Sequence, residues 1–425
     1  AISDVDRLEK TTLQKLSNVG NSFVSIGKRA SILSAALVGV GVKAFSMAAD
    51  FESAFAGVRK TVDATETEFA ILSDGIRKMS MEIPSSADAI ARVAEAAGQL
   101  GIENDNILTF TRTMIDLGQA TNLGADQAAT QLARLANIMR MNQNDFGRLG
   151  STIVELGNNF ATTEAEISEM SLRLAGAGKQ VGLTEAEILS ISTALSSVGI
   201  NAEAGGTAIS KVMMEMQLAA EVGGDALNNF ARVAGVSADD FARAFRDDAA
   251  GALVTFISGL ENAESAGTSA VKVLDDLGIV EIRMRDALLR SAGAGDLMRQ
   301  SLELGTKAWE ENTALTEEAE ERYKTVASQL SILKNNITDV AIQFGDILLP
   351  KIIKVIDKLK DMTHWLSSLS PEMQSTIVAV AGVTAAVGPL LLVIGQVLKT
   401  LPILKAALVA LTGPVGIVVA AIVAA

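Results

Sequence analysis

Apolar residues recur along the first 47 residues in alternating steps of three and four, and this spacing limits what the segment can fold into. The series is Leu16, Val19, Phe23, Ile26, Ala30, Leu33, Leu37, Val40, Ala44 and Met47. A 3.5-residue repeat lines up one side of a helix as a seam that fits another helix. We therefore predict a coiled-coil helix over residues 1–49. A long amphipathic helix lying on the chain's own core is the alternative.

The apolar content of the chain favours an all-α fold. Hydrophobic residues make up 49% of the sequence, but only 4% are aromatic, so Ala, Leu, Ile, Val and Met supply most of the apolar volume. Side chains of this kind suit helices packed on helices, and no sustained apolar/polar alternation indicates strands. We predict long coiled-coil-like helices flanking a compact multi-helix domain, followed by apolar, membrane-competent helices.

The stretch from residue 50 to 300 has the pattern of many short helices. Capping boxes are predicted where Thr163 precedes Glu166 and Thr184 precedes Glu187, with a weaker one at Ser237 and Asp240. Helix ends are predicted at glycines in suitable positions, namely Gly101, Gly118, Gly182 and Gly199.

An internal repeat lies inside this domain, in residues 85–118 and 166–199. Ala94 to Ile102 matches Ala175 to Leu183, with Gln99 aligned on Gln180 at a constant offset of 81. Two helical units with a shared packing arrangement are implied, although two copies are too few to indicate a solenoid.

A second long amphipathic helix is predicted within residues 301–370, starting near Trp309 and running past residue 345. Its seam again alternates steps of three and four, through Val326, Leu330, Leu333, Ile337, Val340 and Phe344. The two seams are the predicted oligomerisation surface. A trimer is expected for the segment 1–50, because its seam positions mix Leu, Ile, Val and Phe without a buried Asn that would impose a dimer.

Residues 371–425 are predicted to form an apolar hairpin that spans a membrane. The run from residue 377 to 398 contains no charge, and a second charge-free run follows Lys405; a bilayer requires about 20 such residues. A deeply buried helical hairpin is the alternative. The apolar residues that mark the membrane segment are Ile377, Val380, Leu390, Leu391, Ile394, Leu398, Ile417 and Val418.

The net charge of −14 is unevenly distributed. Residues 1–47 carry six basic and three acidic residues, whereas residues 377–425 carry only two lysines, so the middle of the chain is strongly acidic. Nucleic-acid binding depends largely on Lys and Arg neutralising phosphates, so no sequence-specific nucleic-acid binding is expected. An acidic middle would let a duplex pass without sticking, or would simply keep the protein soluble.

No arrangement in the sequence indicates an enzyme, a cofactor site or a metal site. The chain has no Cys and a single His, His364, so thiolate chemistry is excluded and a structural role for the histidine is expected. Adjacent acidic pairs such as Asp275 and Asp276 are interpreted as solvated faces or caps, because neighbours on a helix point about 100° apart. The chain ends within an apolar run, and we expect it to be part of a longer protein.

Several stretches resemble the core of phage tail tape measure proteins. They are Phe51 to Phe55, Phe69 to Asp74, Ala94 to Gly101, Leu117 to Thr121 and Gly199 to Ala208, together with the Gly-Pro-containing run from Leu411 to Val418. The resemblance covers roughly residues 50 to 290 and the apolar tail, and it rests on the order and spacing of these sequence motifs.

The resemblance implies a structural protein of the phage tail. Such proteins set tail length during assembly in the host cytoplasm, occupy the tube lumen or tip, and are released at infection to help the genome cross the host membrane. Expected partners are other copies of the chain, tail tube and tail tip proteins, tail assembly chaperones and the host membrane. The same core occurs in prophages and tail-like bacteriocins.

Three other functions fit parts of the sequence. A pore-forming or membrane-permeabilising toxin would explain the apolar tail equally well but not the repeat-bearing core. An integral-membrane signalling protein would need a ligand-binding module, which is not apparent. A helical enzyme is the least favoured, because no constellation of reactive side chains is present.

Overall fold

The computed structural model describes residues 46–265 and 269–343, and every regular element within these ranges is helical. The all-α prediction is therefore confirmed for this part of the chain. Residues Ala49–Val340 form one compact unit. Residue 300, which the sequence suggested as a domain boundary, lies within a helix of this unit.

The unit begins with a helix over residues 46–61, which is followed by short helices up to residue 234. These are α2 (Glu66–Glu82), α3 (Ala87–Gln99), the 3-10 turn η1 (Asn104–Asn106), α4 (Ile107–Ala120), α5 (Ala125–Met139), the 3-10 turn η2 (Gln143–Asp145), α6 (Phe146–Asn159), α7 (Glu164–Gln180), α8 (Glu185–Ser197), α9 (Ala202–Val222) and α10 (Gly224–Ala234).

The remaining described helices run from residue 238 to residue 343. These are α11 (Ala238–Asp247), α12 (Ala249–Ser265), α13 (Ala270–Asp276), α14 (Ile282–Ala292), α15 (Gly295–Glu311), α16 (Ala314–Tyr323) and a last helix over residues 326–343.

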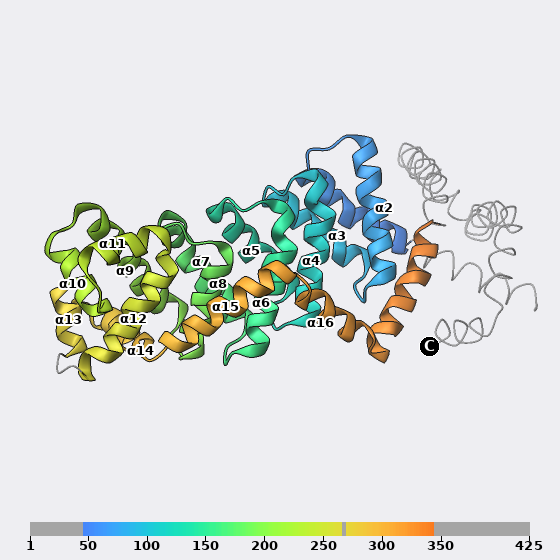
Figure 1. Cartoon of the computed structure of the whole chain (residues 1–425). Helices are drawn as coiled ribbons and strands as arrows, with labels where there is room; N and C mark the ends of the chain where they lie inside the picture. Colours follow the sequence, from blue (N-terminus) through green and yellow to red (C-terminus); the bar gives the residue numbers. More distant parts are fainter. Residues whose placement is uncertain (1–45, 266–268, 344–425) are drawn as a thin grey trace, which may run out of the picture. The chain divides into compact units, whose positions relative to one another are not determined.

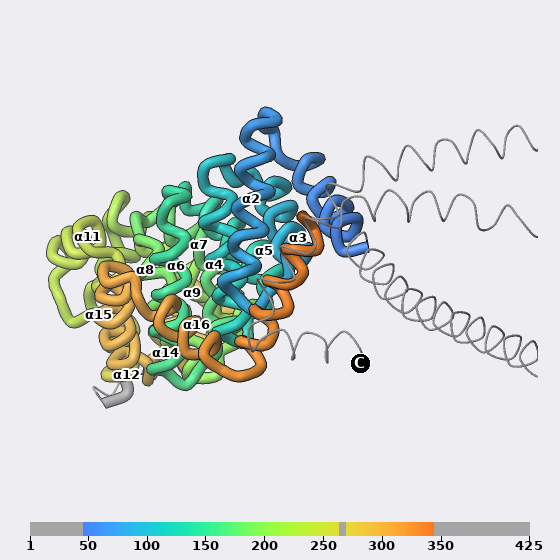
Figure 2. Tube along the Cα trace, turned by 90° about the vertical axis from the view of Figure 1, so that its right-hand side faces the viewer, coloured from blue at the N-terminus to red at the C-terminus, as the bar shows by residue number. Residues whose placement is uncertain are grey.

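The helices of the unit form a row that the chain follows in one direction and then retraces (Figure 1). From α2 the chain proceeds through α4, α6 and α8 to α10 and α11 at the far end of the row. It returns through α14, α15, α16 and helix 326–343, and both views show these helices along one side of the row (Figures 1 and 2). In this return, α15 packs on α8 and α6, while α16 packs on α6 and α4.

Six of the described helices end in the same turn, in which a residue with positive φ is followed by an apolar residue. At Gly101, φ is 81°, and the next amide, that of Ile102, donates to the carbonyl of Ala97 at 3.1 Å. This bond returns to a carbonyl of the last helical turn, as in the Schellman motif. The same amide-to-carbonyl bond follows Arg140, Gly182, Gly199, Gly235 and Gly278.

The two copies of the internal repeat close their first helices in matching ways. Gly182 has a φ of 90°, and the amide of Leu183 donates to the carbonyl of Gly178 at 2.9 Å. These positions lie 81 residues beyond those of the turn at Gly101. Ile102 and Leu183 are both buried, so each copy turns its chain and anchors the turn with one apolar side chain.

The N-terminal ends of the helices follow the capping pattern of the sequence. Complete capping boxes are present at Thr163 with Glu166 and at Thr184 with Glu187, as predicted. Ser237 caps α11 through the amide of Asp240. A further complete box at Thr65 was missed, although its Thr-x-x-Glu spacing was visible in the sequence.

Two local predictions are wrong: the helix end at Gly118, and the single long helix from near Trp309 past residue 345. Gly118 does not terminate a helix but lies in the last turn of α4, where a Cβ would come within 2.8 Å of the Ala125 amide nitrogen. The glycine therefore allows the end of α4 to approach the start of α5.

The single helix predicted from near Trp309 past residue 345 is interrupted twice. Asn312 adopts a φ of 53° and ends α15, a conformation that Asn tolerates better than most residues. A second break follows α16, where the Thr325 hydroxyl accepts from the amide of Ser328 and starts helix 326–343. Each break allows the returning chain to change direction along the row.

None of the helices that the structure describes is long and apolar enough to cross a membrane. The predicted membrane segment at residues 371–425 lies outside the described ranges, as do His364 and the N-terminal seam up to residue 45.

The turn at Gly182 generates a test of the fold. Gly182→Ala should lower the free energy of unfolding by about 1–2 kcal/mol, because a side chain disfavours positive φ. Gly176→Ala is the matched control: Gly176 is an exposed residue of α7, and a Cβ there would have no neighbour within 4 Å. The control should stabilise the protein by about 0.5–1 kcal/mol. Urea unfolding of both variants measures the difference, and equal effects would contradict the role assigned to the turn.

Candidate interaction surface

Five of the predicted oligomerisation residues lie on helix 326–343. They are Val326, Leu330, Leu333, Ile337 and Val340, and we call them the apolar seam. The other predicted seam residues, Leu16, Val19, Phe23, Ile26, Leu33, Leu37 and Phe344, lie outside the described residues. So do all the residues predicted to mark the membrane segment.

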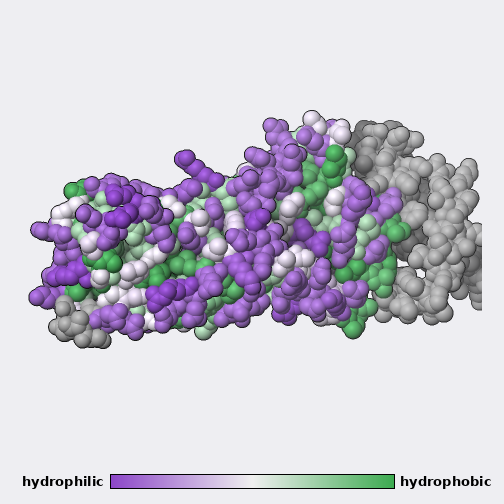
Figure 3. Space-filling model, in the orientation of Figure 1, coloured by the Kyte–Doolittle hydropathy of each residue, from purple (hydrophilic) through white to green (hydrophobic). Residues whose placement is uncertain are grey.

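The apolar seam lies largely at the surface. Val326 is 77% exposed, Leu330 is 54% exposed and Val340 is 43% exposed, while Leu333 and Ile337 are partly buried. Apolar surface is visible at the end of the unit where this helix lies (Figure 3). A helix that packs on a protein body normally turns its apolar side inward, so this helix must be held by other contacts.

The buried side of helix 326–343 carries two polar residues, Asn335 and Asp339, together with Ile342. Asn335 is 7% exposed, and its side-chain amide donates to the backbone carbonyls of Ser80, Ile83 and Ser85 at 3.0, 3.2 and 2.8 Å. The neighbouring Asn336 amide donates to the carbonyl of Met81 at 3.2 Å.

These carbonyls belong to the end of α2 and the loop that follows it. The last carbonyls of any helix lack partners within the helix, and the break after α2, at Ile83 and Pro84, leaves this end without a glycine turn of its own. The two asparagines supply the missing donors from about 250 residues further along the chain. Helix 326–343 therefore caps the C-terminal end of α2.

An ion pair reinforces this contact. The Arg77 guanidinium on α2 lies 2.7 Å from the Asp339 carboxylate, and the Asp339 side chain is only 5% exposed. Asp339 lies one helical turn after Asn335, so the two residues share the docked face. Removing one partner of such a buried pair leaves a charge uncompensated, which is costly.

A second polar anchor holds the end of α16. The Tyr323 hydroxyl donates to the Asp116 carboxylate on α4, and the Arg112 Nε donates to both oxygens of that carboxylate at 3.0 Å. Arg112 also lies 3.3 Å from Glu82 at the end of α2. The anchor thus joins α2, α4 and α16.

Burial controls the protonation of this anchor. It raises the pKa of the Asp116 carboxyl above its usual range, although the Tyr323 hydrogen bond and the Arg112 charge both lower it. Burial and the charge of Asp116 also raise the pKa of the Tyr323 hydroxyl. Tyr323 therefore stays protonated and remains a donor.

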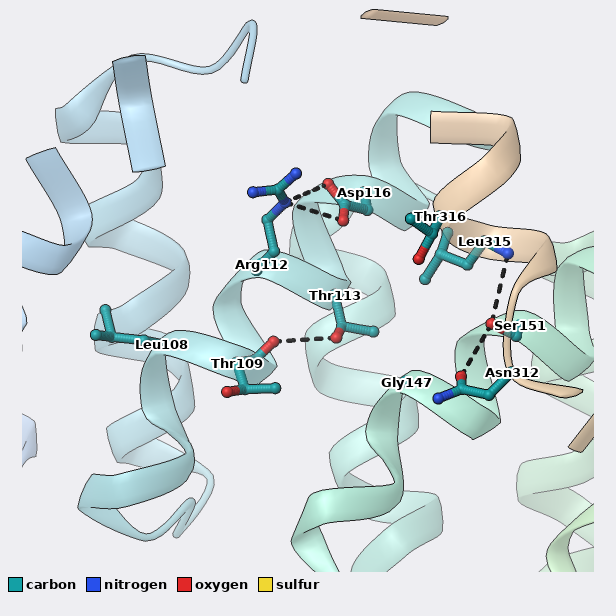
Figure 4. Close-up of a pocket in the computed structure, with 10 residues that line it drawn as sticks. All are labelled: Leu108, Thr109, Arg112, Thr113, Asp116, Gly147, Ser151, Asn312, Leu315 and Thr316. Atoms are coloured by element: carbon teal, nitrogen blue, oxygen red, sulfur yellow. Dashed lines mark hydrogen bonds and ion pairs between the residues drawn. The ribbon is translucent and has the colours of Figure 1, made fainter. Parts of the chain in front are cut away.

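A hollow of about 370 Å³ lies beside this anchor, between α4, α6 and the returning chain. Figure 4 shows Arg112 and Asp116 on the α4 side and Asn312, Leu315 and Thr316 on the side of the returning chain. Ser151 joins α6 to the returning chain, since its hydroxyl donates to the Asn312 side-chain oxygen and accepts from the Leu315 amide. The polar groups of the hollow bond to one another and fix the returning chain in place.

The contacts described here position helices against one another. Within residues 46–265 and 269–343, no group of three or more His, Cys, Asp and Glu side chains could hold a metal ion. What the site offers is a helix fixed on its polar side, with an apolar stripe facing outward. That is the geometry of a surface that binds another helix.

Comparison with known proteins assigns a class to this fold. Residues 73–277 match the family described as phage-related minor tail protein. The chain is 23% identical over 395 residues to the tape measure protein of Pneumococcus phage Dp-1, which covers 92% of this chain and 33% of the relative. It is 28% identical over 139 residues to the probable tape measure protein of Halomonas phage phiHAP-1, which covers 30% of this chain and 16% of that relative.

The matched residues include most of the helices from α2 to α13, so this part of the row is similar to a phage tail protein family. More specifically, the chain is similar to phage tape measure proteins, as the sequence motifs indicated. It spans about a third of the length of the Dp-1 relative. No solved structure is significantly similar to it.

Tyr323 provides a direct test of the second anchor, because it is the only tyrosine in the chain. A tyrosine pKa raised by folding stabilises the protein below pH 10, and this contribution is lost as the pH rises above it. The folded chain should therefore show no tyrosinate absorbance between about pH 10 and 11, whereas the chain in denaturant should ionise near pH 10. Ionisation near pH 10 in the folded chain would contradict the buried anchor.

Asn335→Ala tests the cap on α2. The change leaves buried carbonyls without donors, so we expect a loss of about 1–3 kcal/mol in the free energy of unfolding. Lys334→Ala, at the exposed neighbouring position, should change it by less than about 0.5 kcal/mol. Chemical denaturation of both variants gives the comparison. A loss at Asn335 no larger than that at Lys334 would show that the cap contributes nothing.

Proposed function

We propose that this chain is part of a structural tail protein that sets phage tail length during assembly. The observation that carries this proposal is the alignment with a tape measure protein over 92% of the chain. The protein would occupy the lumen or tip of the tail tube, so its location is the virion, after assembly in the host cytoplasm. It acts without catalysis or cofactors in this account.

The described unit consists of short helices and a chain that turns back on itself, so it is too compact to act as the ruler. Its longest helix, α9, has 21 residues and is therefore about 32 Å long, and the chain turns back along the row. We assign the ruler to continuous helical parts of the longer protein. The unit of residues 49–340 then serves as a folded head or tip module attached to them.

The proposed partners rest on the exposed seam and on the similarity to tape measure proteins. The exposed seam supports self-association, for which a trimer is favoured, and the remaining contacts are assigned to tail tube proteins, tail tip proteins and tail assembly chaperones. The acidic middle of the chain supports passage of DNA through the tube rather than sequence-specific binding.

At infection, the protein is proposed to leave the tail and help the genome cross the host cell membrane. The support for this step is the charge-free sequence between residues 377 and 398 and after Lys405, which has the length and polarity of a membrane segment.

Tail length tests the ruler proposal directly. In-frame deletions of whole heptads in the helical parts of the full-length gene should shorten tails in proportion, by about 21 Å for 14 residues at 1.5 Å per residue. Electron microscopy of the resulting particles measures this. Gly176→Ala, in the folded unit, serves as the control and should leave tail length unchanged. Tails of unaltered length after the heptad deletions would refute the proposal.

A further inference from the structure

The returning chain contains a stretch whose sequence favours one uninterrupted helix. Residues 306–343 contain no Gly and no Pro, although the chain has 35 Gly and 6 Pro among its 425 residues. The stretch is rich in Glu and Ala, which favour helices. The structure nevertheless divides it into the end of α15, α16 and helix 326–343, which run in different directions (Figure 1). The two breaks therefore need an explanation beyond helix propensity.

The first break, at Asn312, is held from α6. The break leaves the carbonyl of Trp309, near the end of α15, without a partner in its own helix. The Arg148 guanidinium donates to this carbonyl at 2.7 Å. The Ser151 hydroxyl accepts from the amide of Leu315, in the first turn of α16, at 3.4 Å. Helix α6 thus caps the helix end on one side of the break and the helix start on the other.

The second break combines local caps with one long-range contact. The Thr325 hydroxyl accepts from the amide of Ser328 at 3.3 Å, and the Gln329 side chain donates to the carbonyl of Tyr323 at 2.7 Å. The Tyr323 hydroxyl donates to the Asp116 carboxylate, so the end of α16 is fixed on α4. Side-chain caps of this kind compete with the continuation of a helix but do not exclude it.

The apolar side chains before and after the second break would share one face of a continuous helix. At 100° per residue, they fall within an arc of about 100°, which is the width of the apolar stripe of a packed helix. The glutamates of the stretch all fall outside this arc. In the bent form, the group before the break is buried against the row, whereas the apolar seam lies largely at the surface. The buried group is Ala308, Leu315, Ala319 and Tyr323, and the apolar seam is Val326, Leu330, Leu333, Ile337 and Val340.

We propose that residues 306–340 are a two-state segment, bent while α6 and α4 hold it on the row and one continuous helix once they release it. The continuous form is about 52 Å long and joins the buried group and the apolar seam on one side. The outward position of the seam is then a consequence of the bend, because the break separates the two halves of one stripe. This inference goes beyond the proposed function and does not depend on it.

Spin-label distances in the full chain test this proposal. The chain has no Cys, so Lys307→Cys with Lys334→Cys places labels at exposed positions on either side of both breaks. A continuous helix separates these positions by about 40 Å, and the bent form holds them closer together. Arg148→Ala with Ser151→Ala removes the caps that α6 supplies and should produce a narrow population near 40 Å. Asn158→Ala, at an exposed position of α6, is the control and should keep the shorter distance.

A second double variant acts on the segment itself and leaves the row unchanged. Asn312→Ala with Thr325→Ala favours helix at both breaks and should give the same population near 40 Å. Tyr323 should then ionise near pH 10, the value for an exposed tyrosine, because it has left Asp116. Glu303→Ala, at an exposed position of α15, should change neither the distance nor the ionisation.

Three results would overturn the proposal. The first is the shorter distance persisting in both double variants, which would show that the bend does not depend on the row. The second is a broad distribution together with ionisation of Tyr323 near pH 10, which would show that the released segment is not a helix. The third is a 40 Å population that disappears when labelled chain is diluted with unlabelled chain, because that distance would then lie between two copies.

Discussion

The packing of α15 against α8 is the contact on which the described unit depends, because it closes an otherwise open row of short helices. A Cβ at Gly305 would lie 2.1 Å from the Ser190 hydroxyl, so a larger residue would have to displace that side chain or separate the two helices. The Ser301 hydroxyl donates to the Ser190 carbonyl at 2.9 Å. Once α15 lies there, α16 and helix 326–343 are directed back toward α4 and α2, and residues far apart in sequence are brought into one unit.

At its far end, the returning chain is held by hydrogen bonds and an ion pair in addition to apolar contacts. A hydrogen bond adds only about 0.5–1.5 kcal/mol net, but a buried group that loses its partner costs about 1–3 kcal/mol. The Asn335 and Asp116 contacts therefore specify where the helix lies more than they increase stability. Because they use one side of helix 326–343, the apolar seam on the other side remains largely at the surface.

Local structure was largely predictable from the sequence, and long-range structure was not. Thr163 and Thr184 begin helices, and Gly101 and Gly182 end them, because caps and positive-φ turns depend on a few neighbouring residues. The break at Asn312 was missed because Asn only permits, and does not require, a positive φ. Gly118 was misassigned because its role, a close approach to Ala125, is set by packing.

The candidate surface was predictable only in part. The spacing identified the apolar seam residues, but it could not show that Val326 and Leu330 face outward. The anchors were missed because Asn335 and Asp339, on the opposite side of the helix, resemble an ordinary solvated face. Their partners lie about 250 residues away, and a single sequence contains no signal that pairs them.

Hydrogen exchange of the full chain tests the central claim, that the returning chain and the start of the row are one cooperative unit. Amides in α2 and in residues 326–340 should open with the same free energy, and both should lose protection together when Tyr323 is replaced by Phe. This is the behaviour of residues that unfold as one unit. Fast exchange of residues 326–340 beside a slowly exchanging α2 would contradict the claim, because the last helix would then lie on the unit without closing it.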